Sequence, residues 1–245
     1  MGIFANPLTD LLEYEDFSRD FLKGTDPVGM TGCIDSEKVH FMSTFLGEKK
    51  VQLVVTYNEQ RAREIEEDYK LFCSQVYVIP PRDLIFFSAD LQGNAIIAER
   101  MKAFAALYQN EAKVIITTMD ALMSAAVPFE QLMSHVIKLK EGDELDLEKL
   151  KHDLTVMGYE RVGRVEEPGQ FTVHGGIADV YPLTMEVPVR IELWGDEIDT
   201  IRCFEPQSQR SMDQIECVSV FPAAEVIADD TATVSYTHLR AHETD

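Results

Sequence analysis

Hydrophobic and polar positions alternate strictly over residues 189–194, and this alternation predicts a β-strand with one buried face. The strand would direct three side chains into a core and three to the outer face: Val189, Ile191 and Leu193 inside, and Arg190, Glu192 and Trp194 outside. Similar short apolar runs, separated by Pro-Gly and Gly-Gly turns, fill residues 166–211. This stretch is therefore expected to consist of consecutive strands joined by tight turns.

The dipeptide Gly195-Asp196 predicts a two-residue hairpin after this strand. In that register Leu193 lies opposite Ile198, and Glu192 lies opposite Asp199. Two carboxylates opposed in this way repel each other. Either the neighbouring arginine or a partner's cation relieves them, or the turn is longer than two residues.

The first half of the chain has a different pattern, in which amphipathic segments alternate with continuously apolar ones. Helices are expected over residues 6–23, 37–46, 58–72, 93–108 and 119–126, and strands over residues 51–55, 76–79 and 114–117. Apolar strands between helices indicate a parallel sheet that is covered on both faces. After residue 128 the pattern changes to a short strand, a helix over residues 146–157 and the strand-rich stretch. We therefore expect a domain boundary between residues 135 and 136.

A glycine-containing turn precedes the helix expected at residues 37–46, where a nucleotide-binding α/β unit has its phosphate loop. Gly29, Gly32 and Ser36 are present, but Ile34 and Asp35 stand where that loop needs glycine and lysine. The aspartate would place negative charge where a polyphosphate lies. We expect a degenerate loop that does not bind ATP, and a simple turn before a helix is the stronger interpretation.

Composition and charge narrow the class of protein. The net charge of -21 over 245 residues argues against a free-standing nucleic-acid binder, which needs a basic surface. The cysteines are scattered without a Cys-x-x-Cys pair, so neither a disulfide framework nor a metal site is indicated. No apolar run reaches the length of a membrane helix, and the N-terminus lacks the pattern of a signal peptide. A cytoplasmic protein with no membrane partner is expected.

Several motifs of the strand-rich stretch occur together in the order of one known domain family. They occupy residues 167–171, 175–182, 190–193, 196–199, 204–206 and 208–211. In this order they resemble the UvrB-type interaction domain, which occurs in the repair helicase UvrB and in the transcription-repair coupling factor family. Residues 145–150 and 158–159 extend the resemblance to residues 136–223. Residues 29–126 resemble, less specifically, the first segment of the coupling factor family, which carries a degenerate nucleotide loop.

The resemblance implies a fold and a division of the chain. Residues 1–135 would form an incomplete, degenerate RecA-like parallel-sheet domain of the P-loop NTPase type, and residues 136–223 a strand-rich α+β interaction domain. Residues 224–233 would begin the return of the chain to the first domain. Residues 234–245 resemble a translated sequencing-adapter sequence, so a truncated piece of a longer protein is expected. For that reason the i, i+4 pair His238 and His242 is not interpreted as a metal site.

The resemblance also implies an adaptor that recruits UvrA to lesions where RNA polymerase has stalled. Arg190 and Trp194 correspond to the arginine and the aromatic residue with which the family binds UvrA, and His174 stands at the position of a further arginine. A neutral imidazole cannot form the fork of a guanidinium, so this contact would be weaker and dependent on pH. From the pattern alone, an edge aromatic that covers a neighbouring loop is an equally good interpretation of Trp194.

Other activities of the family would belong to domains outside this chain. ATP and magnesium would be bound by motor domains, and RNA polymerase and duplex DNA would also be contacted elsewhere. The chain itself would be a monomer without a catalytic residue, cofactor or metal. The alternative is a UvrB-like, ATP-dependent subunit that unwinds DNA, although the tyrosine-rich hairpin of such a protein is not found near Phe86. A further alternative is an α/β protein whose strand-rich part only packs against missing chain.

Overall fold

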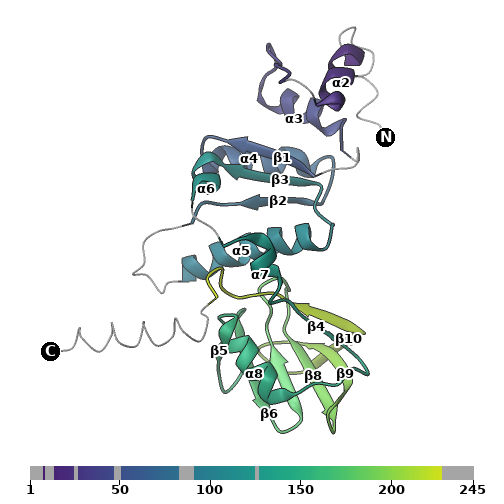
Figure 1. Cartoon of the computed structure of the whole chain (residues 1–245), viewed down its shortest axis with the longest axis vertical. Coiled ribbons are helices and arrows are strands. Elements are labelled where there is room, and N and C mark those ends of the chain that lie inside the picture. Colours follow the sequence, from purple (N-terminus) through teal and green to yellow (C-terminus); the bar gives the residue numbers. More distant parts are fainter. Residues whose placement is uncertain are drawn as a thin grey trace, which may run out of the picture. The chain divides into compact units, whose positions relative to one another are not determined.

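The computed structural model describes residues 8, 14–24, 27–46, 51–82, 91–124 and 127–227, without the side chains of residues 91–94. The aromatic loop around Phe86 and the segment with His238 and His242 lie outside the described residues. Contacts divide the chain into two compact units (Figure 1). The first comprises residues 1–82 and 109–124, and the second comprises residues 83–108 and 125–245.

The first unit contains a three-stranded parallel sheet in the order β1-β3-β2. Its strands are β1 (Gln52–Thr56), β2 (Val76–Ile79) and β3 (Val114–Thr118), and its helices are α2 (Tyr14–Lys23), α3 (Asp35–Ser43), α4 (Glu59–Lys70) and α6 (Met119–Met123). Helix α4 begins at Asn58, whose side chain accepts a hydrogen bond from the backbone N–H of Arg61 at 2.8 Å. The buried face of α4 packs on the central strand through Ala62, Ile65 and Tyr69. The prediction of a mixed α/β unit with a parallel sheet is confirmed.

The second unit contains a six-stranded sheet in the order β10-β9-β8-β7-β6-β5, antiparallel except for the pair β5 and β6. Its strands are β5 (Glu160–Arg161), β6 (Gln170–His174), β7 (Ile177–Val180), β8 (Val189–Trp194), β9 (Glu197–Phe204) and β10 (Ser211–Gln214). Strands β4 (Ile137–Lys140) and β11 (Cys217–Val220) form a separate antiparallel pair. The helices are α5 (Leu91–Tyr108), α7 (Phe129–Met133) and α8 (Leu147–Val156). The strand-rich stretch is therefore confirmed as consecutive strands.

The six-stranded sheet has a core on each face. On the inner face, Leu150 and Leu154 of α8 pack with Phe171, Ile191 and other inward side chains of the strands. On the outer face, Val165, Tyr181 and Phe204 form a smaller cluster at one end of the sheet. This second cluster leaves the opposite end of the outer face accessible.

Helix α5 groups by its contacts with the second unit, whereas the sequence pattern placed it in residues 1–135. Met101 and Ala105 pack with Leu132, Met133 and Phe221. Beside them Arg100 forms a buried ion pair with Glu225, and its Nη2 donates to Oε2 at 3.2 Å. The division by contacts therefore differs from the expected boundary between residues 135 and 136. Every helix in the described part of the chain is too short or too polar to span a lipid bilayer.

Candidate protein-interaction face

Strand β8 has the two faces that its sequence predicts. Val189 and Ile191 are fully buried, Arg190 and Glu192 are half-buried, and Trp194 at the end of the strand is 84% exposed. An indole with this exposure packs against little of its own chain. The interpretation of Trp194 as the cover of a neighbouring loop does not fit this exposure.

Strand register places the candidate side chains in two rows on the outer face. His174, Ile177, Glu192 and Thr200 form one row across β6, β7, β8 and β9. Thr172, Asp179, Arg190 and Arg202 form the neighbouring row. The structure therefore brings His174 and Arg190 to the same face in adjacent rows, and Trp194 extends that face beyond Glu192. We call this surface the interaction face.

Arg190 is held by two contacts within the interaction face. Its Nε and Nη2 donate to the two carboxylate oxygens of Asp179, each at 2.8 Å. Its Cζ lies 4.8 Å from the centre of the Phe204 ring, within the range of a cation–π contact. The hydrogen bonding that Arg190 donates to Asp179 raises the pKa of Arg190, although partial burial opposes the shift, so the guanidinium stays charged. Asp179 is buried and Arg190 retains about a fifth of its side-chain exposure.

The β8–β9 hairpin confirms one expected pairing and corrects another. Leu193 lies opposite Ile198 and Trp194 opposite Glu197, so Gly195-Asp196 form a two-residue turn. Glu192, however, lies opposite Thr200, because a β-bulge shifts the register between Glu192 and Leu193. The hydroxyl of Thr200 donates to Glu192 Oε2 at 3.1 Å. The bulge thus replaces the expected repulsion between two carboxylates with a hydrogen bond.

His174 lies at the exposed end of β6. Its Nε2 is 2.9 Å from the hydroxyl oxygen of Thr172 on the same strand. Thr172 is buried, so this contact ties the exposed imidazole to a fixed point of the sheet. His174 therefore adds a polar group to the interaction face, two strands away from Arg190.

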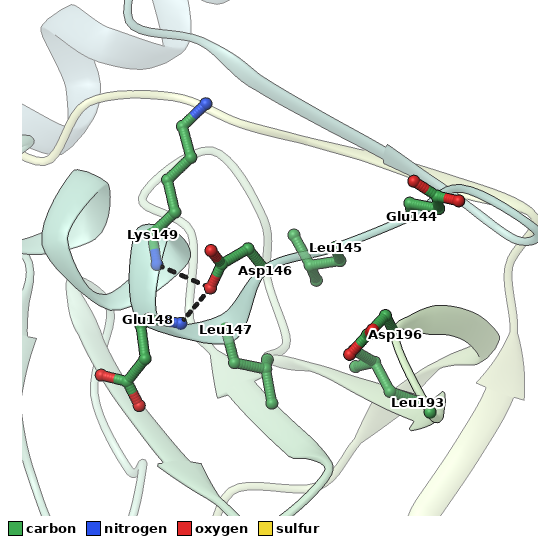
Figure 2. Close-up of a pocket in the computed structure, with 9 residues that line it drawn as sticks. Glu144, Leu145, Asp146, Leu147, Glu148, Lys149, Leu193 and Asp196 are labelled. Carbon is green, nitrogen blue, oxygen red and sulfur yellow. Dashed lines mark hydrogen bonds between the residues drawn. The ribbon is translucent and has the colours of Figure 1, made fainter.

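A groove of about 730 Å³ lies under the hairpin that carries Trp194, and Figure 2 shows its lining. It is formed by residues 144–149 together with Leu193, Gly195 and Asp196. Asp146 caps α8 by accepting hydrogen bonds from two backbone N–H groups, at 2.8 and 3.2 Å (Figure 2). Beside the cap, Leu145 N donates to Asp196 O at 2.8 Å, and Ile198 N donates to the carbonyl of residue 143 at 2.9 Å. These bonds brace the hairpin, so Trp194 projects from a supported turn.

The degenerate loop in the first unit leads directly into α3. Ile34 is the residue before the helix, and its backbone N–H donates a hydrogen bond to the Glu37 carboxylate at 3.0 Å. Asp35 lies 3.3 Å from Arg61 Nη2 and 3.6 Å from Lys38 Nζ. Gly29 and Gly32 precede this helix start, and Ser36 lies in its first turn. The described geometry is that of a turn and a self-capped helix, with the local cations facing Asp35.

No metal-ligand cluster appears among the described residues, where no three His, Cys, Asp or Glu side chains converge. All four cysteines, Cys33, Cys73, Cys203 and Cys217, are free thiols. Burial raises the pKa of the Cys203 thiol, so this thiol is held in its neutral form.

Sequence reasoning missed the residues that support Arg190. Asp179 and Phe204 both lie within the quoted motifs, but alternation along a single strand gives no information about cross-strand partners. A signal was present in the Asp within an otherwise apolar strand, since a buried carboxylate requires a paired donor.

Residues 137–225 match the family model described as the UvrB interaction domain.

Curated relatives that match 86% to 94% of this chain are named transcription-repair-coupling factor. This chain is 34% identical to the transcription-repair-coupling factor of Staphylococcus haemolyticus over 215 residues, which cover 86% of this chain and 18% of the relative. The protein of Staphylococcus epidermidis is 31% identical over 94% of this chain and 20% of its own length. The protein of Staphylococcus aureus is 32% identical over 93% of this chain and 19% of its own length. The chain thus spans about a fifth of the length of the curated relatives it matches.

Proposed function

We propose that this chain is the part of a transcription-repair coupling factor that recruits UvrA to DNA lesions at which RNA polymerase has stalled. The family match and the names of the relatives support the class of function. The single structural observation that carries the proposal is the outward Trp194, 84% exposed, on the same face as the charged Arg190. Tryptophan and arginine are the residues most enriched among the energetically dominant positions of protein interfaces.

In this proposal the chain is a monomeric adaptor and has no catalytic residue of its own. RNA polymerase and duplex DNA are bound by other domains of the longer protein, which is an ATP-dependent translocase. ATP and magnesium belong to those domains. The first unit is a degenerate relative of the RecA-like fold, and Asp35 with its two cationic neighbours supports a loop that no longer holds a nucleotide.

The interaction face offers complementary chemistry for a protein partner. Trp194 supplies an apolar surface on a braced turn, and Arg190 supplies a fixed cation. His174 contributes a hydrogen-bonding group at the position where the family has an arginine. UvrA binding should therefore depend most strongly on Trp194 and Arg190 and less on His174.

The test is the affinity of the full chain for purified UvrA, measured by isothermal titration calorimetry at fixed ionic strength. Arg190→Ala and Trp194→Ala should each weaken binding by about 1 to 4 kcal/mol. Tyr57→Ala is the matched control, because Tyr57 is an aromatic residue of 76% exposure in the first unit. Unchanged affinity with both Arg190 and Trp194 replaced would refute the proposal.

A further inference from the structure

The ion pair between β7 and β8 suggests a role for a residue that contributes little accessible surface. We propose that Asp179 is a positioning residue for partner binding, because its carboxylate fixes the guanidinium of Arg190 in the orientation that UvrA binds. The inference rests on the proposed function, since it concerns the same face and the same partner. It adds a residue that the partner need not touch.

The geometry of the pair is bidentate. Asp179 and Arg190 lie directly opposite each other in the β7–β8 register. The two oxygens of Asp179 accept from Nε and Nη2 of Arg190, both at 2.8 Å. Two parallel hydrogen bonds fix the plane of the guanidinium as well as its position. Asp179 is only 6% exposed, so its own rotamer is restricted by the sheet.

A second contact fixes the face of the guanidinium. The ring of Phe204, a fully buried residue of β9, lies 4.8 Å from Arg190 Cζ. The carboxylate therefore holds one edge of the cation, and the aromatic ring holds one face. An arginine restrained in this way has already lost most of its rotamer freedom, so less is lost when a partner binds.

The pair leaves donors available. A guanidinium carries five N–H donors, of which Asp179 accepts two, so that both N–H groups of Nη1 and one of Nη2 remain. In the described part of the chain, no other hydrogen-bond acceptor is seen for Arg190. About a fifth of the side chain is exposed. Arg190 can therefore hold Asp179 and donate to an acceptor of the partner at the same time.

Asp179 also offsets a repulsion within the sheet. Arg202 of β9 lies directly opposite Arg190 on its other side, so the row contains two cations and one carboxylate. Without Asp179, Arg190 would move away from Arg202 and towards solvent. Two opposite expectations follow. If Asp179 positions the Arg190 guanidinium for the partner, its carboxylate strengthens partner binding; if Asp179 only neutralises the charge of Arg190, its carboxylate weakens partner binding.

The experiment is a double-mutant cycle in UvrA binding by the full chain. Asp179→Asn keeps the shape of the side chain and removes its charge, and it should weaken binding about tenfold. In the Arg190→Ala background, the same replacement should change affinity by less than about threefold, because the group that Asp179 positions is gone. Trp194→Ala is the control background, where the tenfold loss should persist because Trp194 lies four residues along β8 from Arg190, the position opposite Asp179.

The control background separates positioning from a general structural role. A domain weakened by Asp179→Asn would lose the same factor in all three backgrounds, and that result would overturn the proposal. Equal or tighter binding by Asp179→Asn would also overturn it, in favour of masking. If Asp179→Asn does not fold, as judged by circular dichroism, Asp179→Ser replaces it in the same cycle under the same criteria.

Failure of this inference and failure of the proposed function give different results. If Arg190→Ala and Trp194→Ala leave affinity unchanged, the proposed function fails. If both weaken binding but Asp179→Asn does not, only the role of Asp179 is lost.

Discussion

Gly158 lies at the end of α8, and its replacement by alanine is expected to destabilise the second unit strongly. Its φ of +89° is in the region that L-residues disfavour, at a cost of about 1 to 2 kcal/mol. An added Cβ would also lie 2.7 Å from the Ala224 Cβ and 3.2 Å from the Ala224 backbone nitrogen. Overpacking of this kind costs about 1 to 3 kcal/mol. The two effects together predict a loss of about 2 to 5 kcal/mol in the free energy of unfolding.

The steric part is large because the neighbouring backbone cannot move freely. Met157 O accepts hydrogen bonds from Ala223 N at 2.8 Å and from Ala224 N at 3.1 Å. Moving residue 224 away from a new Cβ would lengthen these bonds. The chain after β11 and the end of α8 are therefore expected to respond together.

Gly195→Ala is the matched control for the cost of a positive φ alone, without a steric clash. Gly195 has a φ of +68°, but no atom lies within 4 Å of an added Cβ. Its replacement should cost only about 1 to 2 kcal/mol. Ala224→Gly in the Gly158→Ala background removes the nearest clashing atom and should restore part of the lost free energy of unfolding.

The assay is urea unfolding of the full chain followed by far-ultraviolet circular dichroism, with hydrogen exchange to locate the weakened segments. Faster exchange is expected in residues 147–159 and 217–224 of the Gly158→Ala variant. A free energy of unfolding within about 0.5 kcal/mol of the Gly195→Ala value would refute the steric reasoning.

Two further predictions concern single contacts. Asp146→Ala should lower the free energy of unfolding by about 1 kcal/mol, because two backbone N–H groups of α8 lose their cap. Asp146→Asn keeps a capping oxygen and should stay close to the parent in stability. Equal losses for the two variants in urea unfolding would contradict this prediction. The hydrogen bond from Lys102 lowers the pKa of Glu186, so an NMR titration should find that pKa below the ordinary glutamate value and Lys102→Ala should raise it. The contact between Lys102 and Glu186 stabilises the fold fully above the ordinary glutamate pKa, and this stabilisation is lost as pH falls through the lower pKa of Glu186 in the folded state. An unchanged Glu186 pKa in the Lys102→Ala variant would contradict the role of Lys102.

The sequence predicted the buried and exposed faces of β8 well because alternation along one strand is a local property. It assigned Val189 and Ile191 to the core and Trp194 to the outside, and the structure confirms all three. The turn at Gly195-Asp196 was also predicted, since its residue types favour a two-residue hairpin.

Features that depend on cross-strand neighbours were not predicted. The bulge that places Thr200 opposite Glu192 arises two residues before the turn, beyond the segment that the turn residues control. Asp179 was not recognised because its partner is on another strand. Helix α5 was assigned to the first domain because an apolar stripe indicates that a helix packs, but not against which core.

The packing of α5 has a practical consequence for anyone who cuts the gene. A piece that begins at residue 136 keeps the whole six-stranded sheet but discards Met101 and Ala105, which cover Phe221, and Arg100, which pairs with Glu225. Such a piece would expose Phe221 and remove the Arg100 partner of Glu225, and newly exposed apolar surface favours aggregation. Residues 109–124 follow α5 in the chain and contribute the central strand β3 to the sheet of the first unit. A single cut upstream of α5 would therefore strip β3 of its neighbours β1 and β2, so the second unit cannot be excised cleanly as one continuous piece.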